Sequence, residues 1–271
     1  MPPLVRLDRV GKRFGSGPAV VSGIDLAVEA GEFVTFVGPS GCGKSTLLRL
    51  IAGLIPPTEG AVRIAGAATG SARRSLFLVF QDANLLPWRR AAANIELPLQ
   101  LRGQGRSERW RRAQEMLDLV GLRDAGEKYP WQLSGGMKMR VAIARALSVA
   151  PEILLLDEPF GALDEMTRDR LNEDVLAIRA RDPFTAFFVT HSVAEAVFLS
   201  TRIVVLAPNP GRIADIIPVP FPYPRRAELR ETPGFLALLA QATRALRAVV
   251  PNERGEAAHP APHPAPPAGT A

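Results

Sequence analysis

Short apolar runs alternate with segments of helical periodicity along most of the chain. Four of these runs are rich in β-branched and aromatic side chains, which is typical of strands buried on both faces. They cover residues 33–37, 76–80, 153–156 and 184–190. Helical segments are expected at 44–53, 134–150 and 165–181. Strands that alternate with helices predict an α/β fold built on a mainly parallel sheet.

Further elements are expected toward the two ends of the chain. Near the N-terminus, strands at 4–10 and 24–30 are separated by a predicted loop at 11–17, and another strand covers 60–65. Toward the other end, the pattern predicts helices at 193–199 and 234–249 and strands at 202–207 and 213–219.

The stretch 82–135 has a different character, because it contains proline breaks at Pro87 and Pro98 and many arginines. A helix is predicted over 107–120, with Ser107 as its N-cap. Its apolar positions recur at helical spacing and are Trp110, Ala113, Leu117 and Val120. We interpret this stretch as a mostly helical subdomain inserted into a strand-rich core.

Composition narrows the class of protein. The 271 residues carry a net charge of +6, but the basic residues are scattered and nearly all arginine, so nucleic-acid binding is not favoured. The single cysteine, Cys42, excludes an intramolecular disulfide and a cysteine metal cluster. No apolar run reaches the ~20 residues that span a bilayer, and the start does not resemble a secretory signal. We therefore expect a cytosolic chain that reaches a membrane only through a partner.

The strongest chemical signal follows the strand at 33–37. The motif G-x-x-x-x-G-K-[ST] predicts a phosphate-binding loop when a strand precedes it and a helix follows. Its backbone N–H groups would hold a triphosphate, Lys44 would contact the β- and γ-phosphates, and Ser45 would offer its hydroxyl to Mg²⁺. The helix after it has an expected apolar stripe of Leu47, Leu48, Ile51 and Leu54. The predicted nucleotide-binding residues here are Gly38, Pro39, Ser40, Gly41, Cys42, Gly43, Lys44, Ser45 and Thr46.

A second glycine loop, Ser134-Gly135-Gly136, precedes the helix expected at 134–150. Its hydroxyl, two unobstructed amides and the helix dipole favour an anion. Taken alone, this short motif is better interpreted as an ordinary helix cap; only the other motifs favour an anion site.

Polar residues follow three of the apolar strands, and the carboxyl ends of parallel strands meet at one edge of a sheet. Asp157 would contact Mg²⁺, and Glu158 would orient or deprotonate the attacking water. Gln81 could coordinate Mg²⁺ or that water, and His191 could hydrogen-bond the γ-phosphate. We expect these four residues to converge with the phosphate loop on one catalytic site.

Together these motifs resemble those of the nucleotide-binding subunit of an ABC transporter. GPSGCGKST is similar to Walker A, Gln81 to the Q-loop, LSGGM to the family signature and ILLLDEP to Walker B. The segment ending at Asp164 resembles the D-loop, His191 resembles the switch histidine, and Phe14 occupies the place of the aromatic that stacks on adenine. The resemblance covers roughly residues 4–220.

The resemblance implies a P-loop NTPase (RecA-like) core with an N-terminal antiparallel β-subdomain and an inserted helical subdomain. It implies ATP and Mg²⁺ as ligands and a head-to-tail homodimer, in which ATP lies between the Walker motifs of one subunit and Ser134, Gly135, Gly136 and Asp164 of the other. A separate membrane permease would dock near the segment from Leu85 to Arg89. The chain would then lie at the cytoplasmic face of the inner membrane and serve an extracytoplasmic solute-binding protein indirectly.

Two departures point to a branch of the family. Met137 and Met139 stand where glutamine is common, and LSGGM resembles importers of nitrate, aliphatic sulfonates, taurine and similar small compounds. We therefore predict an ATPase subunit of an ABC importer. The alternative within the family is a soluble ABC ATPase not tied to transport. A P-loop kinase or GTPase and a module that binds ATP without hydrolysing it are less consistent with the motifs.

The predicted domain division has three parts. Residues 1–230 form the nucleotide-binding domain, with its helical subdomain at about 85–150. A C-terminal helix covers 231–250. Residues 251–271 are rich in proline and alanine, include His259 and His263, and are expected to be a disordered tail.

Overall fold

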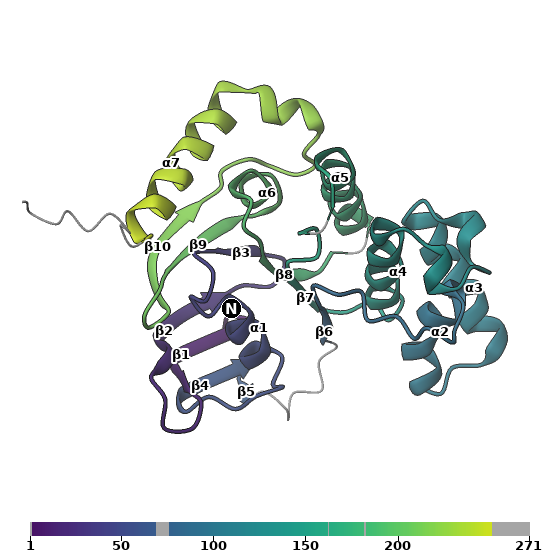
Figure 1. Cartoon of the computed structure of the whole chain (residues 1–271), viewed down its shortest axis with the longest axis horizontal. Coiled ribbons are helices and arrows are strands. Elements are labelled where there is room, and N and C mark those ends of the chain that lie inside the picture. Colours follow the sequence, from purple (N-terminus) through teal and green to yellow (C-terminus); the bar gives the residue numbers. More distant parts are fainter. Residues whose placement is uncertain (1, 69–75, 162, 182, 251–271) are drawn as a thin grey trace, which may run out of the picture.

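A six-stranded sheet runs through the middle of the molecule and an antiparallel sheet lies beside it (Figure 1). The computed structural model describes residues 2–68, 76–161, 163–181 and 183–250. The predicted tail at 251–271 lies outside the described residues.

The central sheet has the order β10-β9-β3-β8-β7-β6. Its strands are β3 (Phe33–Val37), β6 (Leu76–Val79), β7 (Ile153–Asp157), β8 (Thr185–Val189), β9 (Arg202–Ala207) and β10 (Arg212–Pro218). All pair in parallel except β10, which is antiparallel to β9. The prediction of an α/β fold with a mainly parallel sheet is confirmed.

The two faces of this sheet pack into two separate hydrophobic clusters. The side chains of a strand alternate between faces, so Leu155 and Phe187 join one cluster while Leu154 and Phe188 join the other. Every residue of β3, β7 and β8 is consequently buried, which explains why these strands are continuous apolar runs in the sequence.

The second sheet has the order β2-β1-β4-β5 and is antiparallel. It consists of β1 (Val5–Arg13), β2 (Ala19–Val28), β4 (Glu59–Ile64) and β5 (Ala67–Ala68). Helix α1 (Lys44–Ile51) packs its buried leucines into the cluster shared by the two sheets.

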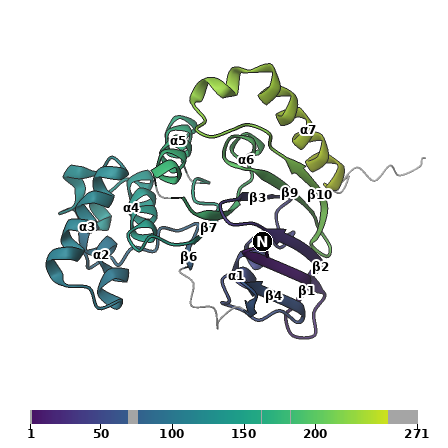
Figure 2. The ribbon, with the colours of Figure 1, turned by 180° about the vertical axis from the view of Figure 1, so that it is seen from behind.

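The remaining helices divide between the two ends of the molecule. Helices α2 (Ala91–Leu101), α3 (Arg106–Leu119) and α4 (Gly135–Leu147) lie beyond β6. Figure 2, from behind, shows α2 and α3 at the end opposite to β10 and the C-terminal helix. Helices α5 (Glu165–Arg181), α6 (Val193–Leu199) and α7 (Pro233–Val249) cover the face of the central sheet opposite to α1. Short 3₁₀ turns occur at Arg123–Ala125, Pro130–Gln132 and Ala227–Glu231.

Several predicted boundaries and faces were wrong. The loop expected at 11–17 shrinks to 14–18, because β1 continues through bulges until Arg13 pairs with Ala19. Ser107 does not cap α3; the cap is Gly105, and Ser107 lies inside the first turn. Leu54 follows the end of α1 and is exposed, so it does not belong to the buried stripe. Trp110 is also exposed, and Met116 fills the core beside Leu117 instead.

None of the helices in the described part of the chain has the length and apolar character needed to cross a membrane.

Candidate active site

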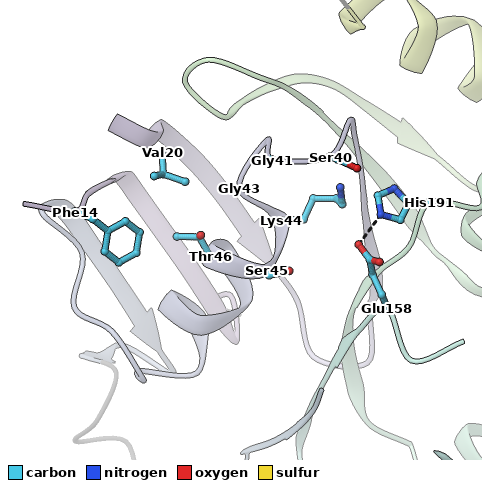
Figure 3. A pocket seen from close by; sticks show the side chains of 10 residues that line it. All are labelled: Phe14, Val20, Ser40, Gly41, Gly43, Lys44, Ser45, Thr46, Glu158 and His191. Carbon is cyan, nitrogen blue, oxygen red and sulfur yellow. Dashed lines mark ion pairs between the residues drawn. The ribbon is translucent and has the colours of Figure 1, made fainter. Parts of the chain in front are cut away.

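A cavity of about 360 Å³ opens between the glycine loop after β3 and the carboxyl ends of β7 and β8. Figure 3 shows the side chains of this loop on one side and Glu158 and His191 on the other. The cavity is lined by Phe14, Val20, Ser40, Gly41, Gly43, Lys44, Ser45, Thr46, Glu158 and His191. Gly38, Pro39 and Cys42 of the same loop do not line it, and Gly38 and Cys42 are buried beneath.

Glycine is required at two points of this loop by its backbone. Gly43 has φ +94°, and a Cβ there would lie 2.4 Å from Cγ1 of Val21. At Gly38, a Cβ would lie 2.6 Å from Sγ of Cys42 and 2.7 Å from the carbonyl oxygen of Leu206. Any side chain at either point would displace the loop from β2 or β9, so the sequence motif follows from close packing as well as from ligand binding.

Lys44 at the start of α1 is buried, and its ammonium group is partly committed within the loop. Nζ donates to the carbonyl oxygens of Gly38 at 2.9 Å and Pro39 at 3.0 Å. An ammonium has three N–H donors, so one remains for an anion in the cavity. These contacts hold the charge at the cavity wall before any ligand arrives.

Ser45 and Asp157 form the oxygen-rich corner of the site. The Ser45 hydroxyl donates to Oδ1 of Asp157 at 2.8 Å. Burial at the end of β7 raises the pKa of the Asp157 carboxyl, while the Ser45 hydrogen bond opposes that rise. Among the described residues, no three histidine, cysteine or acidic side chains are grouped to hold a metal. A hydroxyl and one carboxylate suit Mg²⁺ only when a ligand such as phosphate supplies further oxygens.

Glu158 and His191 meet across the ends of β7 and β8. Nε2 of His191 lies 2.7 Å from Oε1 of Glu158, as the dashed line in Figure 3 marks. Glu158 has φ +48°, in the left-handed region, and its N–H donates to the carbonyl oxygen of Val189. A residue other than glycine rarely adopts this conformation, which turns the carboxylate toward His191 rather than along the strand.

Gln81 follows β6 and reaches the site from a second cavity. This cavity has a volume of about 160 Å³ and is lined by Gln81, Glu158, Gly161, Arg168, Thr190, His191, Ser192 and Glu195. Glu158 and His191 therefore separate the two cavities, and the expected convergence of the strand-end residues is present in the structure.

Phe14 lies at the outer edge of the main cavity, where its ring is 51% exposed. The Lys12 ammonium lies 5.2 Å from the ring centroid. An exposed aromatic face beside a phosphate loop suits stacking with a flat heterocycle. The Cys42 thiol differs, because it is buried and burial raises its pKa, which disfavours the reactive thiolate.

Besides Gly38, Pro39, Cys42 and Asp157, the predicted ligand residues Ser134, Gly135, Gly136 and Asp164 line neither cavity. Ser134 is the N-cap of α4, and its hydroxyl accepts from the N–H of Met137 at 3.3 Å. Asp164 similarly accepts from the N–H of Thr167 at 2.9 Å, which lowers the pKa of its carboxyl. Within one chain, both residues act as helix caps.

The sequence interpretation missed Asn94, whose side chain organises the loop before α2. Its Oδ1 accepts from the N–H of Leu86 at 2.8 Å, and its Nδ2 is within hydrogen-bond distance of the carbonyl oxygens of Leu86, Arg89 and Arg90. Asn94 is fully buried, while Trp88 in the same loop is 70% exposed. An asparagine in the first turn of a helix does not by itself indicate that its side chain holds the preceding loop.

Comparison with known proteins places the chain among relatives of one kind. The family model described as ABC transporter matches residues 21–161. A taurine import ATP-binding protein of Sinorhizobium fredii is 44% identical over 246 residues, which cover 89% of this chain and 92% of that protein. A nitrate import ATP-binding protein of Synechococcus elongatus is 48% identical over 219 residues, or 79% of this chain and 33% of that protein.

Solved structures give the same grouping. A dimeric bacterial ABC transporter cassette aligns with a TM-score of 0.72 and 36% identity, covering 80% of this chain and 99% of that one. A dimeric ATP-binding cassette in a post-hydrolysis state with ADP and phosphate aligns with a TM-score of 0.72 and 35% identity, with the same coverage.

Proposed function

Because this chain belongs to the ABC transporter family, we propose that it is the ATP-binding and ATP-hydrolysing subunit of an importer for a small solute. The observation that carries this proposal is the shared cavity of Lys44, Ser45, Glu158 and His191. A phosphate-binding loop faces a carboxylate–imidazole pair there, which is the arrangement needed to bind a triphosphate and to act on its terminal phosphoryl group.

The loop amides and Lys44 bind the phosphates, and Phe14 stacks on the adenine. Ser45 and Asp157 would hold Mg²⁺, with Gln81 as a further ligand residue, and phosphate oxygens would supply the remaining ligands. Mg²⁺ supplies positive charge that neutralises the phosphates. Glu158 orients the attacking water and accepts its proton, and His191 hydrogen-bonds the γ-phosphate while its ring contacts Glu158 at 2.7 Å.

The remaining ligand residues belong to a second copy of the chain. Ser134, Gly135 and Gly136 present a helix N-terminus away from the chain's own cavities, and such a terminus favours an anion. In a head-to-tail homodimer this loop, together with Asp164, closes over the nucleotide held by the partner. ATP binding then favours the closed dimer, and hydrolysis releases it.

The permease contact is the loop that Asn94 holds. The segment from Leu85 to Arg89 exposes Trp88 on a backbone that Asn94 contacts at the N–H and carbonyl oxygen of Leu86 and at the carbonyl oxygen of Arg89. A rigidly presented aromatic is typical of the centre of a protein interface. The chain then works at the cytoplasmic face of the membrane, while the permease and an extracytoplasmic solute-binding protein select the solute. The relatives' names favour taurine, another sulfonate or nitrate as that solute.

Substitution of the proposed base tests the enzymatic part of this function. Glu158→Gln keeps the size of the side chain but removes the proton acceptor, so we expect ATP affinity within about threefold of wild type and a kcat at least ~100-fold lower. ATP with Mg²⁺ should then hold the variant as a dimer in analytical ultracentrifugation. Wild-type turnover by Glu158→Gln would contradict the assigned role of Glu158.

Transport needs its own test, because a soluble ABC ATPase would pass the first one. The chain should be purified with the permease encoded beside it and reconstituted in proteoliposomes. We expect ATP-dependent uptake of taurine or nitrate with wild type and none with Glu158→Gln. Hydrolysis without binding to that permease would favour the soluble alternative.

A further inference from the structure

The loop that carries His191 is fastened on both sides to Glu195 in α6: Thr190 contacts its buried carboxylate and Ser192 contacts its backbone N–H. The Thr190 hydroxyl donates to Oε2 of Glu195 and accepts from the N–H of Ser192 at 3.0 Å. The Ser192 hydroxyl in turn accepts from the N–H of Glu195 at 3.3 Å. Both neighbours of His191 are thus fixed, whereas the His191 side chain itself is 51% exposed.

Glu195 is only 3% exposed, and a carboxylate in such a place needs a compensating charge. Burial raises the pKa of the Glu195 carboxyl, and the Thr190 hydrogen bond and the nearby cations Arg168 and Arg230 oppose that rise. Nε of Arg168 lies 3.5 Å from Oε1 of Glu195. In the described part of the chain, no hydrogen-bond donor reaches Oε1, so Arg168 is its nearest compensating charge.

The other end of the Arg168 guanidinium contacts a different part of the site. Its NH2 group donates to the carbonyl oxygen of Leu163 at 3.0 Å, immediately before Asp164. Asp164 caps the helix from which Arg168 projects. Arg168 and Glu195 therefore join the segment ending at Asp164 to the loop containing His191, along the wall of the second cavity.

We propose that Arg168 and Glu195 are positioning residues for His191, which act through Thr190 to hold the imidazole against Glu158. This inference rests on the proposed function, in which His191 contacts the γ-phosphate and Asp164 lies at the partner's nucleotide. The contacts of Arg168 with Glu195 and with the Leu163 carbonyl oxygen fix the distance between the segment ending at Asp164 and the loop containing His191. A shift of the Asp164 segment on dimer closure is therefore passed to His191.

Thr190→Val tests the link to His191, because it removes the hydroxyl with little change in shape. We expect kcat for ATP hydrolysis to fall about tenfold, with KM and ATP affinity within about twofold. Thr190→Ser keeps a hydroxyl and should retain at least about half of the wild-type kcat. A loss of equal size in both variants would show that the packing of the threonine methyl, rather than the hydroxyl, is what matters.

The decisive comparison uses a His191→Ala background and single-turnover release of labelled phosphate. If Thr190 and Glu195 act through His191, Thr190→Val should lower the single-turnover rate of phosphate release by less than about twofold once His191 is absent. Equal fold-losses in the two backgrounds would overturn the proposal, because the loss would not pass through the histidine.

Arg168→Met tests the contacts that Arg168 makes with Glu195 and with the Leu163 carbonyl oxygen, at a side chain nearer the surface. It should lower kcat as Thr190→Val does, while Arg170→Met, an exposed change on the same helix, should leave it unchanged. The ¹⁵N signals of the His191 ring, identified by their loss in His191→Gln, should shift in Arg168→Met and not in Arg170→Met. This readout needs no hydrolysis. An inactive wild type would refute the proposed function, whereas unshifted signals would refute the positioning role.

Discussion

At the scale of single residues, Asp157 combines a chemical role with a cost to stability. Its carboxylate is buried at the end of β7, and burial raises its pKa above the ordinary aspartate value. The native state therefore binds this proton more tightly than the unfolded chain does. The contribution of Asp157 to stability is complete below the ordinary aspartate pKa and is lost as pH rises through the native value.

The prediction that follows concerns Asp157→Asn without ligands. At pH 7.5 the amide avoids burying a charge and can still accept from Ser45, so we expect the unfolding midpoint to rise by roughly 2–4 °C, about 1 kcal/mol for a chain of this size. The gain should shrink as pH falls toward the aspartate range. Calorimetry over a pH series measures it, with the exposed Asp124→Asn as control. A gain independent of pH would contradict the argument.

Residues that end apolar strands were the ones the sequence could predict. Asp157, Glu158 and His191 each follow such a run, so their convergence required only the rule for parallel strands. Arg168, Glu195 and Asn94 follow no such rule. Arg168 and Glu195 act through contacts between α5 and α6, and Asn94 acts through side-chain contacts with the loop before its own helix; no pattern of hydrophobic and polar positions records such contacts.

At the scale of elements, the segment before α7 is joined to the core by Arg225. This arginine is buried, and its guanidinium donates to the carbonyl oxygens of Val197 and Phe198 at the end of α6 and to that of Phe221. It also lies 4.1 Å from the ring of Tyr223, whose hydroxyl donates to Leu199. A cation at a helix C-terminus satisfies carbonyl groups that the helix leaves unpaired.

Arg225→Met should therefore destabilise the chain by about 2–4 kcal/mol, because it leaves buried carbonyl oxygens without donors. Urea unfolding followed by circular dichroism measures the change. The exposed neighbour Arg226 provides a matched variant, and Arg226→Met should stay within about 0.5 kcal/mol of wild type. Equal losses of unfolding free energy in the two variants would mean that the buried contacts of Arg225 do not stabilise the chain.

Elements were predicted more reliably than their ends and exposed faces. Strands β3 and β9 and helices α5 and α6 have the predicted bounds, because the strands are almost entirely buried and a capping side chain, Asp164 or Ser192, precedes each helix. The bulged end of β1 and the exposed ring of Trp110 were missed, because the first depends on the irregular register of β1 with β2 and the second on which face of α3 is buried. The division into domains at 230 and 250 stays a prediction.

At the scale of the whole molecule, only the first of the two glycine loops lines the main cavity of its own chain. Ser134 lies outside the cavity of its own chain, so Ser134→Arg should leave ATP affinity of the monomer within about twofold but prevent the ATP-dependent dimer. Ultracentrifugation in the Glu158→Gln background measures both states. Ser107→Arg, at an exposed helix start, is the control. Lost ATP binding by the monomer would place Ser134 in its own chain's site.

Family and fold class were predictable at this scale, and both are confirmed. The order of the strands was not, because periodicity identifies a strand without naming its neighbours. Strand β3 pairs with β8 and β9, which lie about 150 or more residues later in the chain.

That pairing has a consequence for synthesis on the ribosome. The strand leading to the phosphate loop is synthesised about 150 residues before β8, so both of its edges stay bare until β8 and β9 follow. A nascent chain interrupted after α4 therefore has the phosphate loop without the sheet that supports it. Nucleotide can stabilise this loop only once β8 and β9 have been made, and until then the bare edges of β3 can pair with other chains, which a chaperone would prevent.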